Sequence, residues 1–184
     1  MGRSIEFAMW ARSSALCLLA LAAQPQAPQL LPRGPIAVYE QACARCHGPN
    51  GSFYGPDLGL GKTDAQLYKA VQAMADNQGQ IELTPIELEA QTAYHRAIIK
   101  REPFLAITQR TKSMVRGEVT KGSTVTVTVA GKPQKVRVEG VVWSATLEGE
   151  GPVMVTAKRK NAQTQLDPAK ATHSHPSPRL ERAH

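Results

Sequence analysis

The stretch Cys43-Ala44-Arg45-Cys46-His47 constrains this chain more than any other. It brings two thiols and an imidazole into five consecutive positions of a chain that has three cysteines in all. Thiols separated by two residues within one helical turn can both add to the vinyl groups on one edge of a porphyrin, and the next residue then faces the iron. The spacing predicts one covalent haem c per chain, with Cys43 and Cys46 as the thioether residues and His47 as the proximal iron ligand.

Two other chemistries use the same residue types. A thioredoxin-like redox pair normally follows a strand and opens a helix, whereas residues 36–43 have apolar residues at helical spacing. A zinc site requires four ligands, and the candidates beyond the motif are His95 and the tail pair His173 and His175. The motif therefore favours haem. A zinc site or a redox pair, in a protein without haem, stays open as an alternative.

Residues 1–23 are typical of an export signal, followed by a linker over residues 24–35. Arg3 and Arg12 precede an apolar run over residues 15–23, and small residues flank Leu21 as in a cleavage site. Cys17 lies inside this run and is expected to be lost with it. No later apolar run approaches the roughly 20 residues of a spanning helix. We therefore expect a periplasmic protein with no transmembrane segment in the mature chain, soluble or in peripheral contact with a membrane.

Several features flank the motif in a fixed order. Tyr39 lies four residues before Cys43, and a Gly-Pro-Asp-Leu stretch occupies residues 55–58. An amphipathic helix is predicted from an N-cap at Asp64, with Leu67, Val71 and Met74 on one face. A second helix is predicted from the capping box of Thr84 and Glu87, with Pro85 in its first turn, to the residue before Pro103.

In this order of features, residues 36–102 resemble a class I monohaem c-type cytochrome. The resemblance implies a small all-α haem domain over residues 36–104. It implies that Tyr94, on the last helix, meets Tyr39 where the two helices cross near the haem. It also implies that the carbonyl of Pro56 accepts the proton on the other ring nitrogen of His47, which would fix the orientation of the ligand.

The sixth iron ligand is the point at which the resemblance fits least well. The family usually supplies a methionine from the loop between the last two helices, but that loop, over residues 75–83, has no methionine. Met74 stands at its entrance, and it is either the distal ligand or a core residue packed on the porphyrin. The weaker candidates are His95, expected at an outward or rim position, and Met114. An open sixth site is the remaining alternative, and it would permit binding of small molecules.

The second half of the chain has a different periodicity. Residues 123–130 alternate strictly, with valines at 125, 127 and 129 on one face and threonines on the other, and further short strands are predicted within residues 112–160. The chain is therefore predicted to be α+β, with a cytochrome c-like haem domain followed by a small antiparallel β module of unrecognised family. Trp143 is expected in a core or an interface. Residues 161–184 have little apolar content, and we expect them to be disordered.

The charge is uneven along the chain. Residues 36–102 hold six Lys/Arg and eight Asp/Glu, whereas residues 103–160 hold ten and four. The basic half predicts either a solvated face or a docking surface for an acidic partner or anionic lipid. Few aromatic residues accompany these charges, so nucleic acid is not the expected partner.

Together these features predict an electron carrier rather than an enzyme. It would carry single electrons to or from a redox partner protein or a membrane oxidoreductase complex, either freely or as a subunit of that complex. The alternative function is a haem-based binder or sensor of small ligands with an open distal site.

Overall fold

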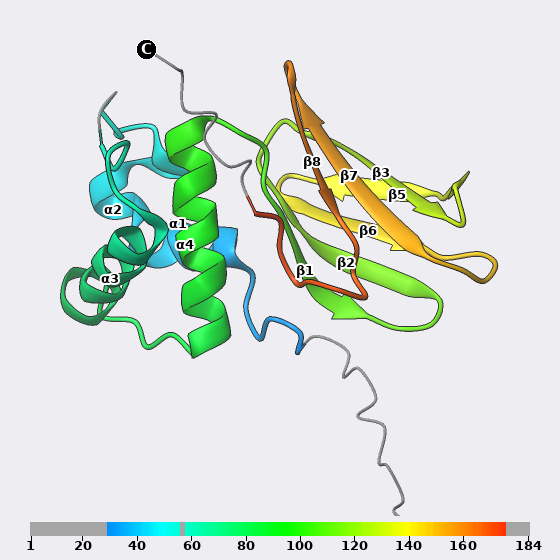
Figure 1. The fold of residues 1–184 in the computed structure, drawn as a ribbon, viewed down its shortest axis with the longest axis horizontal. Coiled ribbons are helices and arrows are strands. Elements are labelled where there is room, and N and C mark those ends of the chain that lie inside the picture. The colour runs from blue at the N-terminus through cyan, green and yellow to red at the C-terminus, as the bar shows by residue number, and fades with distance from the viewer. Residues whose placement is uncertain (1–28, 56–57, 176–184) are drawn as a thin grey trace, which may run out of the picture.

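A helical region is followed by two antiparallel sheets in the computed structural model, which describes residues 29–55 and 58–175. The helices and the sheets lie side by side, with α4 running along the boundary between them (Figure 1). The predicted α+β class is confirmed. The helical elements are α1 (Pro35–Ala42), α2 (Ala44–His47), η1 (Pro49–Gly51), α3 (Asp64–Met74), η2 (Ala75–Gly79) and α4 (Pro85–Lys100).

The two longer helices begin at capping boxes. In α4 the Thr84 hydroxyl accepts a hydrogen bond from the Glu87 backbone and the Glu87 carboxylate accepts one from the Thr84 backbone, as the sequence predicts. The same exchange between Thr63 and Gln66 opens α3. The N-cap of α3 is therefore Thr63 rather than Asp64, which is the first helical residue. The sequence offered two adjacent capping residues, and only Thr63 has its N3 partner.

Eight strands form two four-stranded antiparallel sheets, with strand orders β1-β2-β6-β5 and β4-β3-β7-β8. The sequence predicted about four strands in one small sheet or half-sandwich, so the strand content is larger than expected. The strands begin at Leu105, before residue 112. Their bounds are β1 (Leu105–Arg110), β2 (Met114–Val119), β3 (Thr124–Val129), β4 (Lys132–Pro133), β5 (Val136–Glu139), β6 (Val142–Thr146), β7 (Val153–Arg159) and β8 (Ala162–Leu166).

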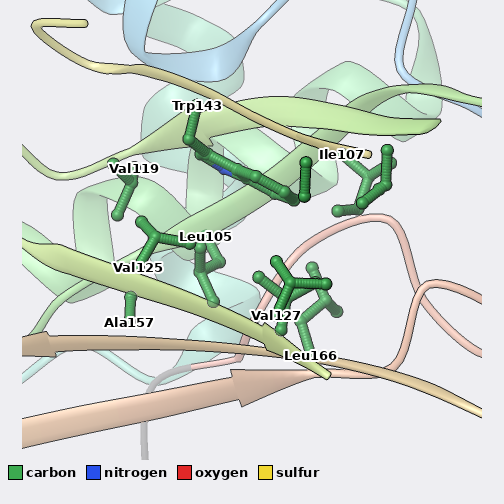
Figure 2. Packing of buried hydrophobic residues seen from close by; sticks show 11 residues of the cluster. Leu105, Ile107, Val119, Val125, Val127, Trp143, Ala157 and Leu166 are labelled. Atoms are coloured by element: carbon green, nitrogen blue, oxygen red, sulfur yellow. The ribbon is translucent and has the colours of Figure 1, made fainter. Parts of the chain in front are cut away.

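The two sheets enclose their own hydrophobic core. Trp143 is fully buried at its centre, and its indole N–H donates to the backbone carbonyl of Glu118 at 3.1 Å. Apolar side chains from both sheets converge around this ring (Figure 2). Alternate residues of β3 face inward, which explains the strict valine–threonine alternation. The core residues are Leu105, Ile107, Val115, Val119, Val125, Val127, Trp143, Ala145, Val155, Ala157 and Leu166.

The segment after residue 160 is ordered as far as residue 175, so the predicted disorder is wrong there. Residues 162–166 pair with β7 as strand β8, and Leu166 joins the core. Farther along, the backbone N–H of Ile107 donates to Thr172 at 2.7 Å, and that of Ser174 donates to Leu105 at 2.8 Å. This segment therefore covers the free edge of β1 and satisfies its backbone groups. The rest of the predicted tail lies outside the described residues.

Glu118 of β2 joins the sandwich to the start of α1. Its carboxylate accepts hydrogen bonds from the backbone N–H groups of Ile36, at 2.7 Å, and Ala37, at 3.3 Å. These groups are unpaired at a helix N-terminus, where a negative charge is also favourable. Gly34, the N-cap residue, leaves the space that the carboxylate occupies, since a Cβ built on Gly34 would overlap it. The position of α1 is therefore set by a residue 82 positions away in the sequence.

Among the described residues, no helix has both the length and the apolar character that crossing a membrane requires. The predicted signal peptide and most of the predicted linker lie outside those residues.

Candidate haem site

The five-residue motif lies at a sharp junction between α1 and α2. Cys43 ends α1 and caps α2, and its carbonyl accepts a hydrogen bond from the His47 N–H at 3.0 Å. Both cysteines are free thiols, with Cys46 exposed and Cys43 half-buried. Burial, and then the nearby Cys46, raise the pKa of the Cys43 thiol. One helical turn therefore holds both thiols and the histidine, which is the arrangement that covalent attachment to one porphyrin edge requires.

The helix α2 stops at Gly48, directly after the histidine. Gly48 has φ of 75°, a left-handed conformation that glycine adopts without steric cost. A Cβ at this position would also overlap the Ser52 hydroxyl. The turn is held from the other side by Glu40, whose carboxylate accepts from the Asn50 N–H at 2.8 Å. The chain is therefore turned back immediately after His47, and this return brings Tyr54 to the histidine.

Two aromatic side chains, Tyr54 and His95, contact the imidazole of His47. The ring of Tyr54 lies 4.9 Å from it between centroids, and the ring of His95 lies 6.4 Å from it at 89°. The Tyr54 hydroxyl and His95 Nδ1 form a hydrogen bond with each other. Tyr54 was not identified from the sequence as a site residue, and its only signal there is that it precedes the Gly-Pro-Asp-Leu stretch. Pro56, the predicted partner of His47, lies outside the described residues.

His95 is buried, so its predicted outward or rim position is wrong. It is 1% exposed, because α4 is covered on several sides and ten of its residues are buried. The rotation of about 100° from Tyr94 does not bring it to solvent. It turns His95 toward His47 and Tyr54 instead. Burial, and then the nearby His47, lower the pKa of His95 to about 3, so its imidazole is neutral at ordinary pH. Its Nε2 is buried without a hydrogen-bond partner.

Helices α1 and α4 cross through two tyrosines. Tyr39 and Tyr94 meet edge to face, with ring centroids 5.4 Å apart and an interplanar angle of 89°. The Tyr39 hydroxyl donates to the carbonyl of Gly48 at 3.3 Å, which links the crossing to the end of the motif. The contact between the two rings is the one that the sequence predicts. Their place beside a haem stays a prediction.

Met74 ends α3 and packs on an apolar cluster rather than standing free. The cluster consists of Leu67, Val71 and Leu88, with further partly buried side chains around it. The following η2 turn lies beside the motif, since Arg45 donates to the backbone carbonyl of Gln78 at 3.3 Å. The contacts of Met74 are those of a core residue, and its role as a distal ligand stays a prediction. Met114, the other methionine candidate, begins β2 opposite Thr146.

The donor set fits a covalently attached haem. It offers two free thiols, an imidazole one residue later, and an apolar cluster formed by α3 and α4. The buried His95 Nε2 without a partner shows that this region contains a polar atom that the protein alone does not satisfy. Among the residues that the structure describes, no group of three or more His, Cys, Asp or Glu side chains is arranged to hold a metal ion. The cysteine pair also follows a helix rather than a strand, unlike a thioredoxin-like pair.

Comparison with protein-family models, with curated proteins and with solved structures gives no match for this chain. A function for this site is therefore argued from its residues and geometry.

Proposed function

We propose that this chain is a periplasmic monohaem c-type cytochrome that carries single electrons between redox partners. Cys43 and Cys46 hold the haem covalently, and His47 is its proximal ligand. The observation that carries the proposal is the placement of two free thiols and the histidine on one helical turn. When bound, haem c supplies a one-electron iron couple.

The surrounding residues orient the ligand. The rings of Tyr54 and His95 both pack against the His47 ring and also contact each other, with centroids 6.0 Å apart. Because His95 is neutral and buried, it would add no charge beside a haem held by His47. A buried, uncharged neighbour would disfavour the more highly charged oxidised iron, so His95 would act to raise the reduction potential. The edge-to-face contact of Tyr39 and Tyr94 fixes α1, and with it the motif, against α4.

The basic β region is proposed to orient the protein on an acidic surface of a redox partner or a membrane oxidoreductase. Residues 103–160 carry ten basic and four acidic residues. Two proteins with oppositely charged surfaces associate faster than neutral ones, and salt screens this attraction. An electron-exchange rate that does not change between low and high salt would contradict this part of the proposal.

A haem-based binder of small ligands is the second candidate, and the packing of Met74 favours it. Met74 packs against Leu67, Val71 and Leu88. If it stays there when the haem is present, the sixth iron position is open to an external ligand. The two candidate functions therefore differ in whether Met74 Sδ coordinates the iron.

Optical spectra of the oxidised and reduced protein distinguish the two candidates. The wild type is compared with Met74→Ala and with the control Met154→Ala, which changes an exposed methionine of β7. A low-spin spectrum with a sulfur-to-iron charge-transfer band that disappears only in Met74→Ala supports the electron carrier. A high-spin spectrum that is unchanged by either substitution and shifts with carbon monoxide supports the ligand binder. A protein that carries no covalent haem after coexpression with the haem-attachment machinery contradicts both.

A further inference from the structure

A cleft of about 830 Å³ lies between the helical region and the sandwich, apart from the two cysteines. One wall is the end of α4 with the loop after the motif, and the other is formed by the β2–β3 and β7–β8 turns. Its volume is within the range of pockets that hold small organic molecules. Ala97 and Ile98 give this cleft an apolar stretch, and the ring of Tyr54 lies at its edge toward His47.

The charged residues that line the cleft are predominantly basic. Arg101, Lys121, Arg159 and Lys160 line it together with Lys100, and among the described residues of the lining Glu102 is the one acidic side chain. Basic residues at the end of α4 are favourable there in any case, because they complement the negative end of the helix. That reason does not apply to Lys121, Arg159 and Lys160, which the sandwich contributes. Two separate β turns therefore bring positive charge to the same space as the end of the helix.

Two buried polar atoms in the lining have no hydrogen-bond partner. Tyr94 is 1% exposed, and its hydroxyl is without a partner although the residue lines the cleft. Asn50 Oδ1 is in the same situation. Burial, and then the charges of Glu40, Tyr39 and Glu118, raise the pKa of Tyr94, and the positive charge of Arg159 acts in the opposite direction. Buried polar groups are normally paired, so two unpaired groups in one cleft indicate a missing partner.

We propose that this cleft binds a small organic anion, a carboxylate or phosphate ester with a compact apolar body. The anionic group is held by Arg159, Lys121 and Lys160, and it accepts a hydrogen bond from the Tyr94 hydroxyl. The body lies against Ala97 and Ile98. Guanidinium and ammonium groups together with a phenolic donor suit this chemistry, because charge-assisted hydrogen bonds to carboxylate and phosphate oxygens are the strong ones. The lining of this site includes neither cysteine of the motif nor His47.

Calorimetric titration of the purified full chain at physiological ionic strength tests the proposal. The probes are phenyl phosphate, benzoate and the neutral benzyl alcohol. We expect saturable one-to-one binding of at least one anion and none of the alcohol. Arg159→Gln should weaken binding about tenfold or more, the effect of losing one charge-assisted hydrogen bond. The control Lys158→Gln removes the same charge one residue away, from an exposed side chain that does not line the cleft, and should change affinity less than about twofold.

Tyr94→Phe separates a specific site from general charge attraction. Because the hydroxyl has no partner within the protein, its removal should leave folding intact and weaken anion binding by about threefold to tenfold. Binding of phenyl phosphate alone, or of benzoate alone, supports the proposal and identifies the anionic group. Failure of both anions to bind overturns it. Equal losses in Lys158→Gln and Arg159→Gln also overturn it, since they would show attraction to the whole basic surface.

Discussion

Replacing Gly34 by alanine tests how the sandwich holds the start of α1. The backbone of Gly34 is extended, with φ of −69° and ψ of 131°, so alanine itself is acceptable there. The new Cβ would overlap the carboxylate of Glu118. The carboxylate would have to move away and release the N–H groups of Ile36 and Ala37. The cost of Gly34→Ala therefore comes almost entirely from Glu118.

The expected magnitudes follow from those two hydrogen bonds. Glu118→Ala should lower the free energy of unfolding by about 2 to 3 kcal/mol, the effect of losing a helix cap and leaving buried donors unpaired. Gly34→Ala should lower it by about 1 to 2 kcal/mol for the same reason. In the Glu118→Ala background the overlap is gone, so adding Gly34→Ala should change the free energy by less than about 0.5 kcal/mol.

Denaturant unfolding of the wild type, the two single variants and the double variant measures this coupling. Gly61→Ala serves as a control, since open space surrounds a Cβ built there. Additive effects of Gly34→Ala and Glu118→Ala would refute the reasoning, because they would show that the two residues act independently.

Three further predictions concern stability to unfolding. Gly117→Ala should cost more than about 3 kcal/mol or prevent folding, because its Cβ would overlap the backbone carbonyl of Ala106 on β1; an effect as small as that of Gly61→Ala would contradict this. Arg33 contacts Glu87 at 2.6 Å and lowers the pKa of Glu87 from 4.5 to about 2. Because the carboxyl pKa is lower in the folded state, ionised Glu87 stabilises the fold at pH values above its unfolded pKa. The contribution is about 1 kcal/mol, since Arg33 is 42% exposed, and it should disappear as pH falls from 4.5 toward 2. The same acid sensitivity in Glu87→Gln would contradict it. Tyr54→Phe should cost about 1 to 2 kcal/mol by leaving His95 Nδ1 unpaired, whereas Tyr94→Phe should cost little; equal costs would contradict this assignment.

Features that depend on neighbouring residues in the sequence were predicted well. The capping box of Thr84 and Glu87 needs only residues three apart, and the alternation of β3 needs only one strand with a buried face. The motif from Cys43 to His47 is equally local. Its place within one helical turn was therefore predicted correctly, whereas haem attachment stays a prediction.

Features set by distant parts of the chain were missed. His95 was expected at the rim because one helix face was taken to be solvated, but the motif and the loop after it cover that face. Strand β8 was missed because its sequence has little apolar content, and pairing with β7 supplies most of its order. The contact of Glu118 with α1 spans 82 residues, and no periodicity could have indicated it. The basic cleft likewise combines two turns and a helix end that are far apart in the sequence.

The most direct test of the proposed function is the intact mass of the exported protein under denaturing conditions. The chain is coexpressed with the haem-attachment machinery and compared with Cys43→Ser, Cys46→Ser and the control Cys17→Ser. The proposal predicts that the wild type and the control retain the mass of exactly one haem and the absorption of a doubly thioether-linked haem after unfolding. It also predicts that either motif variant loses at least one of the two linkages. A wild-type mass equal to that of the bare polypeptide would contradict the proposal.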